Sequence, residues 1–483
     1  MQWAMGISLG AFFALMVGIS LWTRKRVHSG EDFIVAGRGL SPLLTTATIM
    51  ATWYAAETIL VTADAVRDRG LRVTALEPIG ISFCLMVGGL FYAKRIWETK
   101  FLTLADVIGS RFGVVAERIQ ALLSLSYIGW VSVQLVGLAG IFHVFFDLPL
   151  PWGIVITAFV LTLYTLIGGM WSVALTDVFQ LCLLLIGVVA LALTVLSALG
   201  GTPIAGIQSI AAQAKPADLV LVPMDSLVEI QDWLGLIFVG MFGNLASSDL
   251  IQRMFSAKSG RVAARSCFTA GALYLFFGSF PVILGLAGEL LLDDSISGAV
   301  IPALADAFFT PPIAILFALT LTAAVTSSVD SGLLAPASSL ARNIFFPLMK
   351  GRLDLLPLTR LCVIGVAVGS TGLALSGTRA FELLKATYAL GIPAFVVLTF
   401  ALYQKRTVPV AGVVTLVASV LLWLYETIST GMAETSSGAV FSPAFPVVLL
   451  GFSFATYLAT DSLAKRFGAH PPPDSGSDRH TIE

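Results

Sequence analysis

A run of hydroxyl-bearing residues interrupts one of the most apolar stretches of this sequence. Thr326, Ser327, Ser328 and Ser331 accompany the carboxylate of Asp330 among alanines, valines and leucines. Inserting a carboxylate at the centre of a membrane span costs about 2.5–3.5 kcal/mol on insertion scales. We therefore expect Asp330 to have a functional role. Ser327, Ser328 and Ser331 are spaced so that their oxygens converge on one flank of a helix. Hydroxyls joined to backbone carbonyls of an unwound helix suit a monovalent cation such as sodium.

Other interpretations of the same residues stay open. Small side chains also permit close packing of membrane helices, which would need no ion. The four histidines are scattered, no H-E-x-x-H motif or nucleophile–base pair occurs, and the four cysteines show no paired ligand spacing. No repeated filter loop or ring of pore charges typical of a channel is found. The sequence therefore predicts neither an enzyme, a metal cluster nor a channel.

The elements that must position these residues are membrane helices. Hydrophobic residues make up 57% of the 483 residues and charged residues 12%, about half the charged fraction of a soluble domain. Apolar runs long enough to cross ~30 Å of hydrocarbon recur along the whole chain. We predict thirteen spans, at residues 3–22, 41–66, 75–97, 114–146, 152–169, 173–199, 229–252, 266–290, 311–336, 357–376, 381–403, 408–425 and 443–464. The predicted fold class is an all-α integral membrane protein, with the lipid bilayer as its solvent.

Basic residues fix the predicted orientation of these spans. With the N-terminus outside, 22 of the 28 lysines and arginines fall on the inner side, so the topology is N-out and C-in. After the first span, the next ten divide into five plus five, and five is odd. The second group must then enter the membrane from the opposite side, which permits a LeuT-like inverted repeat with a solute site at the midplane. Thirteen helices without internal symmetry are the alternative.

This scheme divides the chain into six parts. They are the first span with a basic inner loop (1–40), a first five-helix repeat (41–199), an outside loop (200–228), a second five-helix repeat (229–406), two additional spans (407–466) and a tail (467–483). The tail is rich in proline, serine and aspartate, so we expect it to be a disordered cytoplasmic segment.

Several motifs follow one another between residues 35 and 350. They read ATW at 51–53, PIG at 78–80, GGLFYAK at 88–94, TLYTLIGG at 162–169 with SVA and TD just after, QR at 252–253, and SSVDS at 327–331 through ARNI at 341–344. In this order they resemble the sodium:solute symporter family, and within it the high-affinity choline transporter branch. The resemblance implies sodium-coupled solute transport on a LeuT-like fold.

The resemblance also implies an ion site. In the family, the principal sodium site corresponds to the backbone carbonyls of Ala51, Tyr54 and Ala324 and the hydroxyls of Ser327 and Ser328. Those carbonyls are available only if the helix near residues 51–56 is broken. Neither glycine nor proline occurs at residues 51–56, so the local sequence does not indicate a break in the helix.

A second ion site or an inner gate is implied around Asp177, Asp330 and Ser331. Family members with two sodium ions carry a hydroxyl where this chain has Asp330. Asp177 follows Gly168 and Gly169 closely, so a helix N-cap is the alternative role for its carboxylate.

The solute site implied by the resemblance contains aromatic and acidic side chains. Its candidate residues are Trp53, Glu57, Glu77, Trp130, Ser247 and Asp249. Two tryptophans facing one cavity could enclose a quaternary ammonium by cation–π attraction. The choline branch has a further tryptophan where this chain has Ser247, so one wall of such a cage is absent. Three acids at membrane depth favour a positively charged or amine-bearing solute, although packing tryptophans and acids bonded to backbone would fit the same pattern.

The predicted function is sodium-coupled secondary active symport that imports a small polar solute, with sodium as the coupling ion. The expected location is the inner (plasma) membrane, as a multi-pass protein. A transporter-like membrane sensor that binds solute without net transport is the alternative. The expected partners are the solute and the bilayer, with no nucleic acid, because the net charge is −1, and with no obligate protein partner.

Overall fold

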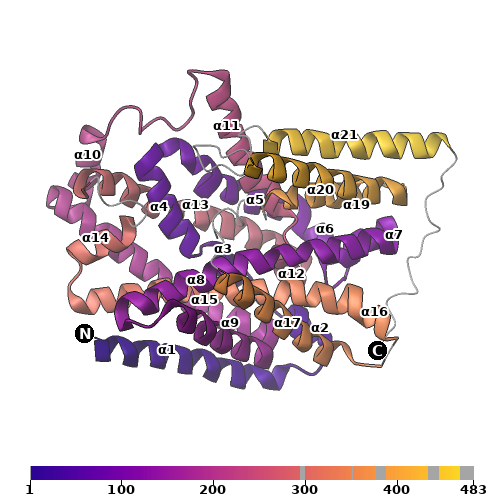
Figure 1. The fold of residues 1–483 in the computed structure, drawn as a ribbon, viewed down its shortest axis with the longest axis horizontal. Helices are drawn as coiled ribbons and strands as arrows, with labels where there is room; N and C mark the ends of the chain where they lie inside the picture. Colours follow the sequence, from indigo (N-terminus) through magenta and orange to yellow (C-terminus); the bar gives the residue numbers. More distant parts are fainter. Residues whose placement is uncertain (1, 294–299, 351, 377–387, 433–444, 468–483) are drawn as a thin grey trace.

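The computed structural model describes residues 2–293, 300–350, 352–376, 388–432 and 445–467. Within these ranges the chain forms helices joined by loops and turns, the longest of them at residues 214–226, and no β-strand is present. Most of the long helices run roughly along the longest axis of the molecule, with α20 and α21 stacked along one side (Figure 1).

The helices of the first half of the chain are α1 (Gln2–Thr23), α2 (Gly30–Val35), α3 (Pro42–Trp53), α4 (Ala56–Arg69), α5 (Ile81–Val87), α6 (Ala93–Glu98), α7 (Leu104–Leu123), α8 (Tyr127–Phe146), α9 (Leu150–Gly200) and α10 (Pro203–Gln213). Those of the second half are α11 (Leu227–Phe238), α12 (Ser248–Ser256), α13 (Gly260–Leu291), α14 (Val300–Phe308), α15 (Pro311–Leu340), α16 (Phe346–Met349), α17 (Leu355–Leu375), α19 (Gly391–Tyr403), α20 (Pro409–Met432) and α21 (Phe445–Arg466).

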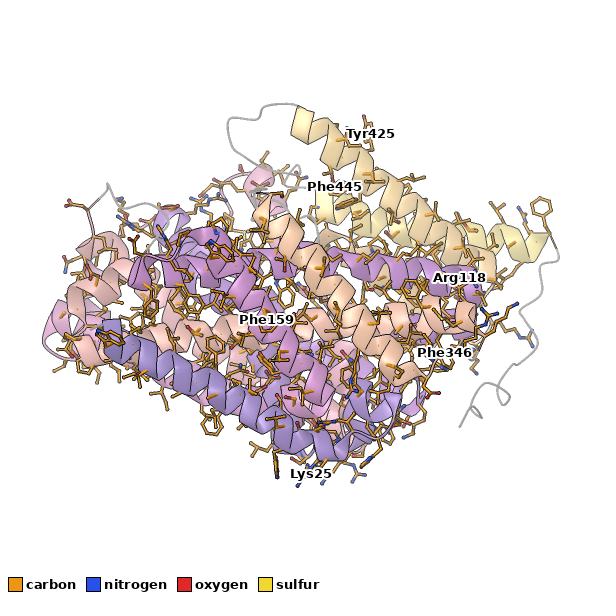
Figure 2. The ribbon with its side chains drawn as sticks, turned by 60° about the horizontal axis from the view of Figure 1, so that its bottom comes forward. Lys25, Arg118, Phe159, Phe346, Tyr425 and Phe445 are labelled. Carbon is orange, nitrogen blue, oxygen red and sulfur yellow. The ribbon has the colours of Figure 1, made fainter. Side chains whose placement is uncertain are left out.

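The outer surface of this bundle is apolar. In the described ranges, nine helical segments are long and apolar enough to cross a membrane, and the bent pair of α11 and α12 makes a tenth. Large side chains such as Phe159 and Tyr425 point outward, 67% and 69% exposed (Figure 2). Such a large apolar surface is unfavourable in contact with water but is compatible with the hydrocarbon core of a bilayer. The predicted class of an all-α integral membrane protein is therefore confirmed.

The number of spans and their orientation stay predictions. Residues 381–387 of the predicted span 381–403, and residues 443–444 of the last one, lie outside the described residues. The predicted tail 467–483 is described only at Phe467. The N-out, C-in topology and the six-part division of the chain likewise stay predictions.

Two predicted spans form one long, kinked helix. The predicted spans 152–169 and 173–199 both fall in α9, which bends at Gly169. The backbone there has a φ of +51°, and a Cβ atom would lie 2.5 Å from the carbonyl oxygen of Phe33. Only glycine fits this position without strain. The sequence marks this bend, because the Gly168-Gly169 pair stands at the predicted boundary.

The span predicted at 114–146 corresponds to the second arm of α7 and to α8, because α7 is kinked at Gly113, directly before the predicted start. α7 starts at Leu104, where Thr103 and Asp106 form a reciprocal capping box. The amide of Asp106 donates to the Thr103 hydroxyl at 3.0 Å, and the amide of Thr103 donates to the Asp106 carboxylate at 3.2 Å. Asp106 and Arg111 lower the apolar character of this first arm of α7, which precedes the predicted span.

α3 and the segment from α11 to α12 are broken helices. α3 ends at Trp53, Tyr54 takes a ψ of 71°, and Ala55 is extended before α4 begins at Ala56. The segment from α11 through η7 (Val239–Gly243) bends by 43° before α12. Each broken helix is the first helix of a predicted five-helix repeat. This is the arrangement that an inverted repeat with a midplane site requires.

α15 is the helix at the centre of the bundle. It packs against α9, α8, α17 and α3, and every residue from 320 to 341 is buried. The hydroxyls and the carboxylate that the sequence singles out are therefore in the interior and do not face lipid.

Candidate functional site

Two serines of α15 lie against the end of α3. The Ser327 hydroxyl donates to the carbonyl of Ala51 at 3.0 Å and to that of Ala324 at 3.0 Å. The Ser328 hydroxyl lies 3.3 Å from the carbonyl of Thr52 and 3.3 Å from that of Ala324. All five residues are buried. We call Ala51, Thr52, Ala324, Ser327 and Ser328 the hydroxyl cluster.

Tyr54 lies at the break itself. It is the first residue beyond α3, and its phenol donates to the carbonyl of Phe277 at 2.8 Å. Its ring packs edge-on against Tyr274, with centroids 5.5 Å apart. These contacts with α13 hold the chain out of the helical path although the local sequence has no glycine or proline. The structure adds Thr52, which sequence reasoning did not include, to the carbonyls that the serines contact.

A second buried group of residues includes Thr48, which lies one turn before Thr52 on α3. The Thr48 hydroxyl donates to the carboxylate of Asp177, and Arg253 donates through Nε to the Thr48 carbonyl and hydroxyl, both at 3.1 Å. The Arg253 guanidinium also lies 3.8 Å from Asp177 and donates to the Ser331 hydroxyl. The other oxygen of Asp177 has no hydrogen-bond partner in the described part of the chain.

Asp330 completes this group from the α15 side. Its carboxylate accepts hydrogen bonds from the Tyr164 phenol at 3.2 Å and the Ser331 hydroxyl at 3.4 Å. Ser331 also lies 3.1 Å from the Thr52 hydroxyl, so this group touches the hydroxyl cluster. We call Thr48, Asp177, Arg253, Asp330 and Ser331 the charged cluster. It holds two carboxylates and one guanidinium, all fully buried.

One expectation for this region is wrong, and one residue is new to the site. Asp177 lies inside α9, well beyond the kink at Gly169, so the interpretation of Asp177 as a helix cap is wrong. The reason is that the second arm of α9 continues directly from Gly169 and starts before Asp177. The new residue is Arg253, which the QR motif at 252–253 contains and which the structure places beside Thr48, Asp177 and Ser331. A base at the end of an apolar span is also typical of an inner loop, so its position in the sequence does not identify this role.

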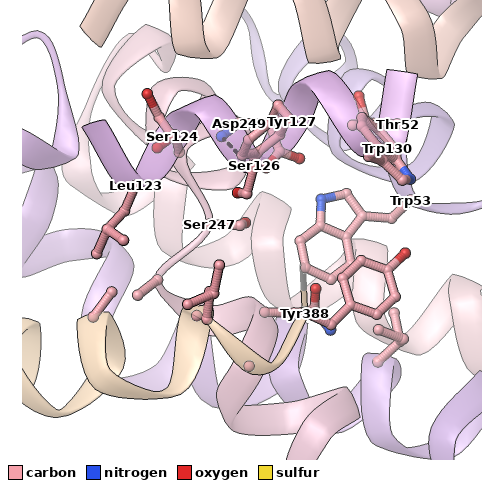
Figure 3. A pocket seen from close by; sticks show the side chains of 18 of the residues that line it. Thr52, Trp53, Leu123, Ser124, Ser126, Tyr127, Trp130, Ser247, Asp249 and Tyr388 are labelled. Carbon is pink, nitrogen blue, oxygen red and sulfur yellow. Dashed lines mark hydrogen bonds between the residues drawn. The ribbon is translucent and has the colours of Figure 1, made fainter. Parts of the chain in front are cut away.

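A cavity opens beside the break in α3. It encloses about 790 Å³ of empty space, including its open mouth. The structure brings five of the predicted residues together, because the cavity is lined by Trp53, Glu77, Trp130, Ser247 and Asp249. Figure 3 labels all of them except Glu77. The side chain of Glu57, the sixth, lies outside the described residues.

The walls of the cavity are aromatic and polar. Tyr127 and Trp130 of α8 pack edge-on with ring centroids 5.8 Å apart, and the Tyr127 phenol donates to Asp249. Glu77 accepts a hydrogen bond from Tyr274 at 3.3 Å. Tyr127, Asn244 and Tyr388 also line the cavity and were not among the predicted residues. Tyr127 lies one helical turn before Trp130 on the same face, a spacing that could have identified it.

Comparison with known proteins agrees with this architecture. Residues 33–410 match the sodium:solute symporter family. The chain is 30% identical over 364 residues to the human high affinity choline transporter 1, a match that covers 70% of this chain and 61% of that protein. It is 24% identical to sodium/proline symporter 2 of Staphylococcus saprophyticus, over 88% of this chain and 86% of that protein.

A solved structure of a Na⁺-coupled sialic acid symporter superposes with a TM-score of 0.79 at 18% identity, covering 97% of this chain and 98% of that one. The shared architecture is the LeuT fold, as predicted. These relatives are transporters and not enzymes. The central hydroxyls, the broken helices and the match over most of the chain lead to one conclusion: this protein belongs to the sodium:solute symporter family.

Proposed function

We propose that this protein is a sodium-coupled secondary active symporter that imports a small polar solute bearing a positive charge. The observation that carries the proposal is the contact of the Ser327 and Ser328 hydroxyls with carbonyls at the broken end of α3, at 3.0 and 3.3 Å. Oxygens from two different membrane helices meet there, and none of them carries a formal charge.

The chemistry of these donors fits sodium. Hydroxyl and carbonyl oxygens are ligands that hard monovalent cations accept, and a neutral set of ligands lets the ion leave again. As ligands we propose the carbonyls of Ala51, Tyr54 and Ala324 with the hydroxyls of Ser327 and Ser328. The contact between Ser328 and the Thr52 carbonyl makes Thr52 an additional candidate.

The solute is proposed to bind in the cavity lined by Trp53, Glu77, Trp130, Ser247 and Asp249. Thr52 links the two sites, because its carbonyl contacts Ser328 while the residue itself lines the cavity. An ion that holds α3 against α15 therefore also holds one wall of the cavity. By thermodynamic linkage, solute and sodium must strengthen each other's binding by the same factor.

The charged cluster is proposed to act as an inner gate. A second sodium ion beside Asp177, Asp330 and Ser331 would lie close to Arg253, whose guanidinium already donates to Ser331 and lies 3.8 Å from Asp177. Like charges at such distances repel strongly inside a protein. We propose that movement of α3 away from α15 opens this gate and releases sodium inward, in a protein of the plasma or inner membrane.

The experiment is uptake by the purified protein in liposomes, with radiolabelled choline as the probe and an inward gradient of either sodium or potassium. We expect accumulation with sodium only. In Ser328→Ala we expect the sodium concentration for half-maximal uptake to rise about tenfold, which corresponds to about 1.4 kcal/mol for one lost ligand. Ser370→Ala is the matched control, because Ser370 is also fully buried but lies on α17, outside both clusters.

Two results would contradict the proposal. An unchanged sodium requirement in Ser328→Ala would remove the hydroxyl cluster as the ion site. Sodium-dependent binding of the probe without accumulation would instead identify a sensor.

A further inference from the structure

Asp249 presents a carboxylate oxygen to the cavity. It lies in the first turn of α12, directly after the bend that follows η7, and is 5% exposed. The Tyr127 phenol donates to Oδ1, and the Asp249 amide lies 3.4 Å from the same phenol oxygen. Oδ2 accepts no hydrogen bond from any described residue. The carboxylate is thus held in one orientation while one of its oxygens keeps its capacity to accept.

The nearest buried base does not neutralise this carboxylate. Arg253 donates through Nη1 to the backbone carbonyl of Asp249 at 3.1 Å. Its other nitrogens are directed at Thr48, Ser331 and Asp177 in the charged cluster. Among the described residues, no ion pair includes Asp249. A nearly buried carboxylate without a counter-charge favours a cation that enters the cavity.

Asn244 places a second acceptor on the same wall. Asn244 directly follows η7. Its amide nitrogen lies 3.3 Å from the carbonyl of Val239 and 3.2 Å from that of Gly240. These two carbonyls fix the nitrogen side of the amide, so the oxygen is the side left for a ligand. Asn244 lines the cavity and is 6% exposed.

Asp249 and Asn244 are hydrogen-bond acceptors in fixed positions. They suit a cation that can donate a hydrogen bond. A quaternary ammonium has no N–H and relies on aromatic faces. A protonated amine can make charge-assisted hydrogen bonds, which are about twice as strong as neutral ones. Trp53 and Trp130 provide faces for the apolar part of either solute. Ser247 also lines the cavity and adds no aromatic face to it.

We infer that the solute is an organic cation with at least one N–H, a primary, secondary or tertiary ammonium whose N–H donates to Asp249. This inference rests on the proposed function and narrows the solute of the same cavity. It makes Asp249 a specificity-determining residue, and it makes choline a weaker ligand than its less methylated relatives.

The test is a series of ligands that lose N–H groups one at a time. Ethanolamine, N-methylethanolamine, N,N-dimethylethanolamine and choline share one hydroxyethyl arm and a positive charge at pH 7. Apparent Kd values come from the ligand-induced rise in unfolding temperature of the full-length protein in sodium. We expect the last methyl group to raise the Kd about tenfold or more in the wild type, since a hydrogen bond to a charged group is lost.

Variants assign this effect to a residue. In Asp249→Asn, we expect the step between dimethylethanolamine and choline to shrink to less than about threefold, because the acceptor is no longer charged. Asp225→Asn, an identical change in an exposed loop, should keep the full step. Tyr127→Phe keeps the carboxylate and should also keep the step; loss of the step in this variant would show that the phenol, and not the charge of Asp249, sets the preference. If Asp249→Asn does not fold, the wild-type series still decides whether an N–H is required.

Three results would overturn the inference. The first is choline binding as tightly as dimethylethanolamine in the wild type, which would leave sodium-coupled symport intact and remove only the N–H requirement. The second is a full step that persists in Asp249→Asn. The third is no binding of any of the four ligands by a protein that sodium still stabilises, which would exclude this class of solute while the ion site stands.

Discussion

The hydroxyl cluster and the charged cluster are neighbours with opposite electrostatic designs. Both join α3 to α15: Thr52 and Thr48 lie one turn apart on α3, and Ser327 and Ser331 lie one turn apart on α15. In the hydroxyl cluster, all oxygens are neutral and belong to hydroxyls or the backbone. In the charged cluster, the guanidinium of Arg253 lies 3.8 Å from Asp177, and Ser331 links it to the second carboxylate, Asp330.

This difference distinguishes a site that can bind and release a cation from a group whose charges are already matched within the chain. A hydroxyl can donate to a carbonyl, as Ser327 does to Ala51, or can turn its oxygen toward a cation. Either arrangement leaves no buried charge unmatched. Arg253 has no such freedom, because its removal would leave Asp177 and Asp330 facing each other in the interior. We therefore expect changes in the charged cluster to affect stability first, and changes in the hydroxyl cluster to affect sodium dependence first.

The largest effect is expected for Arg253→Gln. Removing one partner of a buried ion pair costs roughly 3–5 kcal/mol, because the remaining charge is uncompensated. Thermal or denaturant unfolding in detergent would measure the loss. The double variant Arg253→Gln with Asp177→Asn should recover part of it, while Arg265→Gln, on the exposed side of α13, should change little. If the double variant were no more stable than the single one, the two residues would not act as a pair.

A smaller effect is expected for Ser331→Ala, at the contact between the clusters. The Ser331 hydroxyl accepts from Arg253 and donates to the Ser327 carbonyl at 2.8 Å. Losing a hydrogen bond to a charged group costs about 1.5–3 kcal/mol of unfolding free energy. The sodium requirement of uptake should rise less than in Ser328→Ala. An equal rise would place Ser331 among the sodium ligands and erase the distinction between the clusters.

The burial of the polar residues of α15 could be predicted from the sequence. Hydroxyls and an acid in an apolar span have few stable positions other than the interior, so burial of Ser327, Ser328 and Asp330 follows from the cost of exposing them to lipid. The kink at Gly169 was visible for a similar reason, because a glycine pair between two apolar runs marks a bend. The cavity brought Trp53, Trp130 and Asp249 together as the family resemblance implied.

Contacts between distant segments were not visible in the same way. The break after Trp53 depends on Tyr54 packing against Tyr274 and bonding to Phe277, on a helix far away in the sequence. The role given to Asp177 as a cap failed because a local signal was read without the partner, Thr48, that accounts for it. Arg253 was missed because a base near the end of a span resembles an inner-loop residue until its fully buried surroundings are known.

The measurement that tests the central claim most directly is the unfolding temperature of the purified protein in sodium chloride and in potassium chloride at equal ionic strength. A ligand that binds only the folded state raises this temperature. We predict that sodium stabilises the wild type and Ser370→Ala more than potassium does, and that this difference disappears in Ser327→Ala with Ser328→Ala. A double variant that kept the full sodium-specific stabilisation would contradict the account, because the ion would then bind elsewhere.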